Sequence, residues 1–264
     1  MNFTEESNTS LKKKYLEGGE KMENLKRILA SLIGVMILST ASVNARSIRT
    51  PDGNMPLVHW AVVESTDGDM QKIIDIGAKV LAPVVPSESG TYCLYGGIDV
   101  ENPNVMRLLE IYESFEAYRI HGSSEAFQQY RAERLPILKG LKILEVNGIV
   151  LEQKSEGVGT IVYMRRIEVE PAQLAKYQQL VSEEAIRSVR EDSGVMGMFI
   201  TAEQANPNII HTMEIYKNAA AYENYVNSPK NQELTKKTKS MIISAKTIEN
   251  LPTKIILSDK GFRQ

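Results

Sequence analysis

An internal repeat constrains the fold of this chain of 264 residues more than any other feature. The tripeptide Asn-Pro-Asn occurs at 102–104 and again at 206–208, and Glu-Ile-Tyr occurs at 110–112 and again at 214–216. Both pairs are 104 positions apart, since 206 minus 102 equals 214 minus 110. One register held over this length indicates two copies of one structural unit. Further pairs in the same register are Ser89-Gly90 with Ser193-Gly194, Ala117-Tyr118 with Ala221-Tyr222, Ser124 with Ser228, and Lys142 with Lys246.

The repeat divides the chain into segments. Residues 57–151 form the first repeat and 160–257 the second. The stretch between them, 152–159, is polar and contains glycine, so we expect a linker there. Residues 1–45 precede both repeats and are predicted to be an N-terminal extension with a signal peptide.

The N-terminal segment has the order of a secretory signal. Lys26 and Arg27 precede an apolar run at 28–38, which small residues follow up to Ala45. The run is shorter than the roughly 18 apolar residues that usually span a bilayer. We therefore expect cleavage after Ala45 and a periplasmic or secreted protein, with an uncleaved membrane anchor as the alternative.

The first 21 residues are unusual in front of a signal. Residues 17–21 would be encoded by purine-rich codons that resemble a ribosome-binding sequence, which suggests Met22 as the initiator. The sequence leaves open whether Met1 or Met22 is the true start.

Each copy has the periodicity of a βαββαβ unit. Asn-Pro-Asn between two apolar runs predicts a hairpin turn, because proline fixes φ and asparagine tolerates turn conformations. The second copy repeats the order of the first, with a long helix expected over 171–192. The first copy is expected to contain strands at 58–64, 91–99, 105–113 and 142–151, and helices at 69–85, 114–121 and 124–138.

A single βαββαβ unit packs its helices on one face of an antiparallel sheet and leaves the other face bare. The strand at 106–112 is apolar on both faces, as burial on two sides requires. We therefore predict an α+β fold: tandem ferredoxin-like repeats whose sheets close face to face into an intramolecular dimeric α/β barrel. The sequence leaves open whether this pseudo-dimer associates further.

Composition excludes several classes of protein. A net charge of −2 gives no electrostatic reason to expect nucleic acid as a partner. The single cysteine, Cys93, lies in an expected strand, where a thiol usually acts as a small buried apolar group. The sequence contains no Cys/His cluster with metal-ligand spacing, no phosphate-binding glycine-rich loop after a strand and no Gly-x-Ser-x-Gly elbow. Metal and nucleotide enzymes are therefore disfavoured.

Residues 110–127 carry a family resemblance. Glu110-Ile111-Tyr112, Ser114, Glu116-Ala117-Tyr118, His121 and Ser124-Glu125-Ala126-Phe127 resemble the antibiotic biosynthesis monooxygenase (ABM) family of dimeric α/β barrels, particularly its quinol monooxygenase-like members. The resemblance implies a barrel of two ferredoxin-like units. In enzymatic members it also implies oxidation of a quinol or related hydroxylated aromatic by molecular oxygen, without a cofactor.

The resemblance points to His121 as a catalytic residue. The family's histidine in this helical segment lies near the substrate cavity, and His121 matches it, whereas the second copy has Tyr225. Such chemistry needs a base of near-neutral pKa, donors for the anion and apolar walls. We therefore predict His121 as base or orienting donor and Tyr112 as the second catalytic residue. The substrate-pocket candidates are His59, Trp60, Glu110, Tyr118, Tyr216 and Tyr225.

Other interpretations compete with these. Glu110 and Glu214 share a strand position; either could be a base, but their presence in both copies favours a structural ion pair. A haem-degrading relative is disfavoured, because Arg131 and Thr235 stand where its iron ligand would lie. The main alternative is a non-catalytic envelope barrel that binds a small apolar or aromatic ligand. An isomerase of small sugar-derived signals would need a more polar cavity.

Overall fold

The computed structural model describes residues 45–99, 101–154, 159–250 and 257–259. The predicted signal and the alternative start at Met22 lie outside these residues. Within the described ranges, none of the helices is both long and apolar enough to span a bilayer.

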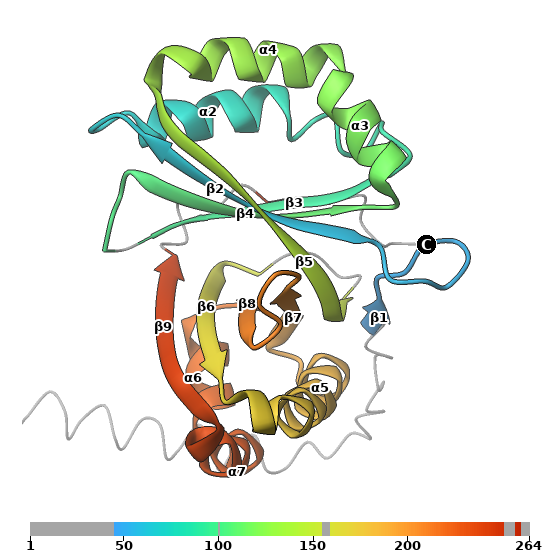
Figure 1. The fold of residues 1–264 in the computed structure, drawn as a ribbon, viewed down its shortest axis with the longest axis vertical. Helices are drawn as coiled ribbons and strands as arrows, with labels where there is room; N and C mark the ends of the chain where they lie inside the picture. Colours follow the sequence, from blue (N-terminus) through green and yellow to red (C-terminus); the bar gives the residue numbers. More distant parts are fainter. Residues whose placement is uncertain (1–44, 100, 155–158, 251–256, 260–264) are drawn as a thin grey trace, which may run out of the picture. The chain divides into compact units, whose positions relative to one another are not determined.

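The first repeat follows the expected βαββαβ order (Figure 1). A short strand, β1 (Ala45–Ser47), precedes it, and a 3₁₀ turn, η1 (Leu135–Ile137), leads into its last strand. Its elements are β2 (Leu57–Ser65), α2 (Met70–Val80), β3 (Thr91–Ile98), β4 (Val105–Tyr112), α3 (Phe115–Ser123), α4 (Glu125–Arg134) and β5 (Leu138–Lys154).

The second repeat has the same order. Short 3₁₀ turns, η2 (Pro171–Gln173) and η3 (Lys239–Met241), precede its long helix and its last strand. Its elements are β6 (Ile161–Val169), α5 (Leu174–Glu191), β7 (Val195–Glu203), β8 (Ile209–Tyr216), α6 (Ala219–Val226), α7 (Pro229–Thr238), β9 (Ile242–Asn250) and β10 (Leu257–Asp259).

The strands of both repeats form one antiparallel sheet in the order β10-β3-β4-β2-β5-β7-β8-β6-β9. Strand β5 joins the repeats, because its first half pairs with β2 and its second half with β7. In the second repeat β9 pairs with β6, and β10, the next strand along the chain, pairs with β3. Strands β9 and β10, at the two ends of the strand order, together correspond to β5: β9 pairs within its own repeat, and β10 pairs with the other repeat. The predicted barrel of two tandem ferredoxin-like units is confirmed.

The barrel interior is an apolar core to which both repeats contribute. Trp60 and Tyr95 from the first repeat pack in one buried cluster with Phe199 and Met213 from the second. The Tyr95 and Phe199 rings meet edge to face with centroids 5.6 Å apart. Trp60 Nε1 donates a hydrogen bond of 3.0 Å to Thr201 Oγ1, so its polar atom is satisfied across the repeat boundary.

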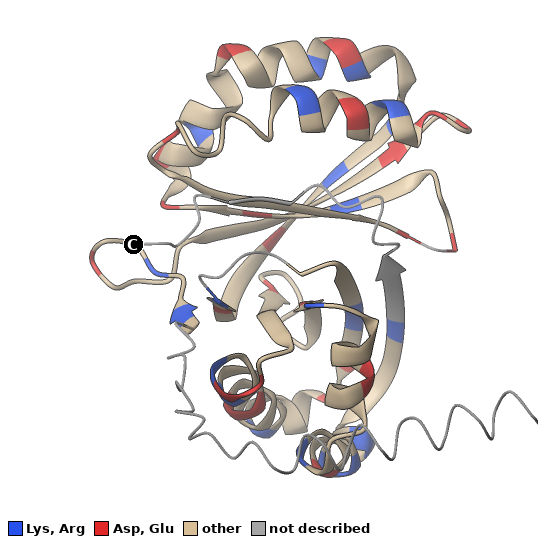
Figure 2. Ribbon diagram, turned by 180° about the vertical axis from the view of Figure 1, so that it is seen from behind, with Lys and Arg blue, Asp and Glu red and all other residues tan. Residues whose placement is uncertain are grey.

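The helices cover the outer face of each half of the sheet. Helices α2, α3 and α4 pack on the first repeat, and α5, α6 and α7 on the second (Figure 1). Positive and negative side chains alternate along these helices, and many form ion pairs within a helix (Figure 2). Besides the core that the repeats share, each repeat has an apolar core of its own between its sheet and its helices.

Local sequence signals explain the short helices. Ser114 and Ser124 are the N-caps of α3 and α4, and each hydroxyl accepts a hydrogen bond from a backbone N–H three residues on. Asn218 and Ser228 cap α6 and α7 in the same way at the same repeat positions. The repeat thus preserves the start of both short helices.

Helix α2 is shorter than predicted. The apolar spacing predicts a helix over 69–85, but the helix ends at Val80 and turns follow. Pro83 accounts for the difference, because proline lacks the N–H of a helical hydrogen bond and restricts the residue before it. The sequence prediction placed the stop at Pro86, one proline too late.

Strand β5 is longer than predicted. Glu152, Gln153 and Lys154 are expected in a linker, yet they are buried and belong to β5. Their backbones pair with β1 and β7, and their side chains have polar partners on β1 and across the core: Ser47 Oγ on β1 donates a hydrogen bond to Glu152 Oε1, and the Tyr95 hydroxyl on β3 donates one of 2.7 Å to Gln153 Oε1. Polar residues can occupy a central strand when other elements of the fold supply their hydrogen bonds.

Close packing at Gly194 gives a testable prediction. A Cβ at this position would lie 2.6 Å from the Ala221 Cβ, and the equivalent Gly90 has the same relation to Ala117, at 2.4 Å. We expect Gly194→Ala to lower the free energy of unfolding by about 1–3 kcal/mol, as overpacking does. Urea denaturation measures this, with Gly122→Ala as control, because nothing lies within 4 Å of that Cβ. A Gly194→Ala protein as stable as the wild type would contradict the prediction.

Candidate active-site cavities in the two repeats

Each repeat contains a cavity between its sheet and its helices. The cavity of the first repeat has a volume of about 330 Å³, and that of the second about 670 Å³. Residues 104 positions apart occupy equivalent places in the two cavities, such as Glu110 and Glu214 or His121 and Tyr225. The two cavities therefore occupy equivalent places in the two repeats and can be compared position by position.

Glu110 on β4 borders the first cavity. Burial raises the pKa of its carboxyl group to about 7, although a hydrogen bond from Tyr112 and the charge of Arg134 act in the opposite direction. The Tyr112 hydroxyl donates that bond to Oε2 over 3.3 Å. Close to neutral pH this carboxyl group exchanges a proton readily, which is the property of a general base.

Arg134, at the end of α4, lines the same cavity. Its side chain is buried, with 5% of the residue exposed, and the guanidinium carbon lies 4.7 Å from the centre of the Tyr130 ring. Among the described residues its Nε has no hydrogen-bond partner. A buried cationic donor of this kind can stabilise an anion formed in the cavity.

His121 on α3 also lines the first cavity. Its Nδ1 lies 2.7 Å from Glu88 Oε2, and the ring packs against Tyr112 and Phe127 with centroids 5.5 and 5.1 Å away. Because Glu88 occupies Nδ1, a ligand in the cavity could use only Nε2. Its catalytic role stays a prediction.

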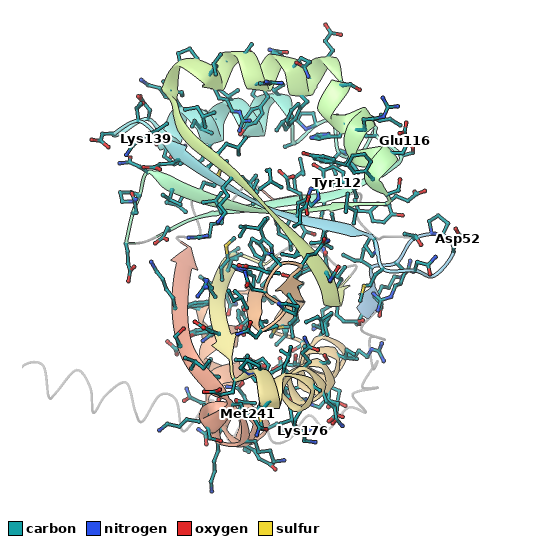
Figure 3. The ribbon with its side chains drawn as sticks, in the orientation of Figure 1. Asp52, Tyr112, Glu116, Lys139, Lys176 and Met241 are labelled. Atoms are coloured by element: carbon teal, nitrogen blue, oxygen red, sulfur yellow. The ribbon has the colours of Figure 1, made fainter. Side chains whose placement is uncertain are left out.

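Two more predicted tyrosines belong to the aromatic cluster of this cavity. Tyr112 lies between the strands and α3 (Figure 3), and burial keeps its pKa well above the usual value. Tyr118 packs edge-on against Tyr112, with centroids 5.3 Å apart, and both line the cavity. At neutral pH both hydroxyl groups remain protonated and can donate hydrogen bonds.

His59 and Trp60 lie elsewhere. His59 packs against the far side of Tyr118, 4.8 Å between ring centroids, and burial lowers its pKa. Trp60 points to the opposite face of the sheet, into the core between the repeats. Neither residue is among those that line the two cavities. Successive residues of a strand face opposite sides, so the adjacent pair could not share one pocket.

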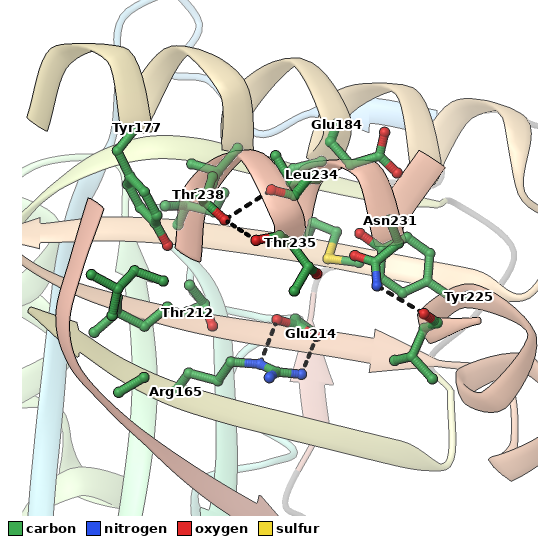
Figure 4. Close-up of a pocket in the computed structure, with 18 of the residues that line it drawn as sticks. Arg165, Tyr177, Glu184, Thr212, Glu214, Tyr225, Asn231, Leu234, Thr235 and Thr238 are labelled. Atoms are coloured by element: carbon green, nitrogen blue, oxygen red, sulfur yellow. Dashed lines mark hydrogen bonds and ion pairs between the residues drawn. The ribbon is translucent and has the colours of Figure 1, made fainter. Parts of the chain in front are cut away.

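The second cavity carries an ion pair where the first has an unpaired carboxylate. Arg165 on β6 donates two hydrogen bonds to Glu214, from Nε at 3.0 Å and from Nη2 at 3.3 Å (Figure 4). Tyr216 donates a third, of 2.8 Å, to the same carboxylate. The position equivalent to Arg165 in the first repeat is Ala61. Among the residues that the structure describes, the structural ion pair favoured by the sequence is therefore present at Glu214 and absent at Glu110.

The remaining predicted residues lie around this ion pair. Tyr225, at the position of His121, lines the second cavity, and burial raises its pKa. Tyr216 lies beside the cavity, behind Glu214, and is fully buried. Both tyrosines thus support the cavity wall from α6 and β8.

The sequence did not indicate three residues of the two sites: Arg134, Arg165 and Glu88. Arg134 stands in the last turn of a helix, where a basic residue is expected for the helix dipole alone. Arg165 reaches Glu214 from a neighbouring strand, so the pairing depends on the register of β6 with β8. A comparison of the repeats could have found it, because a small apolar residue, Ala61, stands where the second repeat has the cation Arg165.

Comparisons with known proteins agree with this architecture. A family model described as antibiotic biosynthesis monooxygenase matches residues 160–237. The crystal structure of a proposed monooxygenase from Lactobacillus acidophilus NCFM is similar, with a TM-score of 0.72 and 20% identity over 79% of this chain and 98% of that chain. A proposed monooxygenase from Fusobacterium nucleatum gives a TM-score of 0.71 and 18% identity over 78% of this chain and 95% of that one.

A third similar structure is that of an anthrone oxidase-like protein, with a TM-score of 0.53 and 10% identity over 83% of this chain and 98% of that chain. No curated protein matches the sequence. At these identities the solved structures show a shared fold. The family match supports the resemblance to the ABM family, and it lies within the second repeat of this chain.

Proposed function

We propose that the chain is a cofactor-independent monooxygenase that oxidises a quinol or related hydroxylated aromatic in the cavity of the first repeat. The observation that carries this proposal is the carboxyl group of Glu110, whose pKa of about 7 suits a general base. The ABM match and the proposed monooxygenases of the same fold support a monooxygenase-like function.

The first step needs a proton acceptor. A hydroxylated aromatic donates an electron to oxygen far more readily after it has lost its hydroxyl proton. Glu110 takes that proton, and the buried guanidinium of Arg134 stabilises the phenolate that results. Tyr112, Tyr118 and His121 orient the ring and provide donors.

The overall reaction balances with oxygen as the only co-reactant. A quinol and one O₂ give a hydroxyquinone and one water molecule. One oxygen atom forms a new bond to a ring carbon, and the other leaves as water with two hydrogen atoms from the substrate. Glu110 returns its proton to the departing oxygen, so the carboxylate is regenerated for the next turnover.

The first repeat fits this reaction better than the second. Its cavity volume of about 330 Å³ is near the lower end of typical ligand sites, which suits a one- or two-ring molecule. In the second repeat Arg165 pairs with the carboxylate at the same position, so that group has a fixed counter-charge. A base and a separate cation are therefore available in the first repeat.

Oxygen consumption tests the proposal. We expect the purified protein to consume oxygen with 1,4-hydroquinone or 1,4-dihydroxynaphthalene faster than a protein-free control for autoxidation. His121→Ala should lower the rate about tenfold, a loss of about 1.4 kcal/mol of transition-state stabilisation. Saturable binding of these quinols without oxygen uptake would replace the proposal with the non-catalytic binding barrel.

The pH profile follows from the state of Glu110. Because the base acts only when deprotonated, kcat/KM should rise as the pH passes about 7 and then level off. Rates are measured from pH 5.5 to 8.5, with autoxidation subtracted at each pH. A rate that is flat across this range would argue against Glu110 as the base.

A further inference from the structure

The proposed reaction does not use the cavity of the second repeat. This cavity has about twice the volume of its counterpart, 670 against 330 Å³. The difference arises from smaller side chains on α7 and β9. Asn231, Leu234 and Ala245 stand where the first repeat has Phe127, Tyr130 and Leu141.

A buried hydroxyl group without a partner lines this cavity. Thr212 on β8 is 7% exposed, and its Oγ1 has no hydrogen-bond partner within the part of the chain that the structure describes. An unpaired buried hydroxyl costs about 1–3 kcal/mol. The equivalent residue of the first repeat, Leu108, avoids this cost. Thr212 therefore has the features of a group that a ligand satisfies.

Two further polar groups border the cavity beside Thr212 (Figure 4). Arg165 uses Nε and Nη2 to hold Glu214, which leaves the two hydrogens of Nη1 for an oxygen of a ligand. Burial and the nearby Glu214 raise the pKa of Tyr177 to about 12, so its hydroxyl group is a donor at neutral pH.

The charge of the site favours an uncharged ligand. Arg165 and Glu214 neutralise each other, and Glu184, which also lines the cavity, is paired with Arg187. The remaining charged lining residue, Lys239, is exposed, so the interior offers hydrogen bonds without a net charge to attract an anion. The walls around it are formed by Met198, Leu234 and Tyr222, which suit an apolar ring system. A hydroxylated or carbonyl-bearing aromatic satisfies both features.

We infer that the second repeat holds a separate ligand site, which binds an uncharged, oxygen-bearing polycyclic aromatic molecule through Thr212, Tyr177 and Arg165 without oxidising it. Since the carboxylate there is held by Arg165, the site has binding groups but no unpaired base. This site is distinct from the proposed reaction in the first repeat and does not require it.

Calorimetric titration with 1,8-dihydroxyanthraquinone tests the inference. This probe is already a quinone, so binding is measured without turnover. Thr212→Val keeps the shape of the side chain and removes the hydroxyl group, and we expect about tenfold weaker binding. Leu234→Tyr introduces the side chain of the first repeat at this position and should abolish binding. Thermal melts establish that both variants are folded.

Matched controls separate this inference from the proposed reaction. Glu110→Gln changes only the first cavity and should bind the probe as tightly as the wild type. Anthracene, which has no oxygen atom to pair with Thr212, should bind more weakly and equally well to the wild type and Thr212→Val. Unchanged binding of the probe by folded Leu234→Tyr, or its loss in Glu110→Gln, would overturn the second site. Loss of oxygen uptake alone would not.

Discussion

Glu110→Gln is expected to lower kcat for oxygen uptake at pH 8 by a hundredfold or more, since general base catalysis contributes about 10²–10⁴. Glutamine keeps the shape of the side chain and can still accept the hydrogen bond of the Tyr112 hydroxyl, but it cannot take a proton. An oxygen electrode measures the effect. The matched control is Glu214→Gln in the second repeat, which should leave the rate close to that of the wild type.

The same substitution should stabilise the protein at alkaline pH. The pKa of Glu110 is raised from 4.5 to about 7 by folding, so the folded state binds this proton more tightly than the unfolded state. Stability from this residue is therefore retained below pH 4.5 and lost as the pH rises through about 7. We expect Glu110→Gln to be up to about 3 kcal/mol more stable than the wild type at pH 8, with little difference at pH 4.

Urea denaturation at the two pH values measures this difference. A variant that loses both activity and stability at pH 8 would indicate that Glu110 is structural. Loss of activity together with a gain in stability would indicate a catalytic role, because a buried carboxylate that serves as the base lowers the stability of the folded protein.

Phe199→Ala is expected to cause the largest loss of stability. The ring is fully buried in the core shared by both repeats, and its removal should cost about 3–5 kcal/mol. This is a large share of the roughly 5–15 kcal/mol by which folded proteins are usually stable. Phe115→Ala is the control, because Phe115 is 68% exposed and its loss should matter little.

The course of unfolding is a second readout. Trp60 is the only tryptophan of the chain and lies in the same core cluster as Phe199. Its fluorescence therefore follows the contact between the repeats, while far-UV circular dichroism follows all elements. We expect both signals to change at one urea concentration, lower in Phe199→Ala than in the wild type. Two separate transitions would show that the repeats unfold independently.

The fold could be predicted from the sequence because each helix and strand is indicated by two copies of the same pattern. The two Asn-Pro-Asn turns, the capped short helices and the apolar strands recur in one register, and the structure has them all. Where a feature occurs in one copy only, prediction was weaker. Pro83, which ends α2, has no counterpart in α5, where the equivalent residue is Arg187.

The site was less predictable than the fold. Position in a strand placed Glu110 and Tyr112 together, and resemblance placed His121 near them. The pKa of Glu110, however, depends on residues from other strands. Glu214 is paired with Arg165, whereas the residue equivalent to Arg165 near Glu110 is Ala61, which carries no charge. A pKa set by burial and by partners on other elements cannot be obtained from local spacing.

The strand β5 has a consequence for how such a chain can evolve. Because one half of the strand pairs with each repeat, we expect a change in the stability of one repeat to affect the other. After a gene duplication that fused two identical units, one cavity could therefore accumulate functional residues that lower stability, while the other cavity acquired ion pairs that neutralise its charges. The buried carboxyl group of Glu110, which has no arginine at position 61, and the neutralised pair of Arg165 and Glu214 fit that division within one shared sheet.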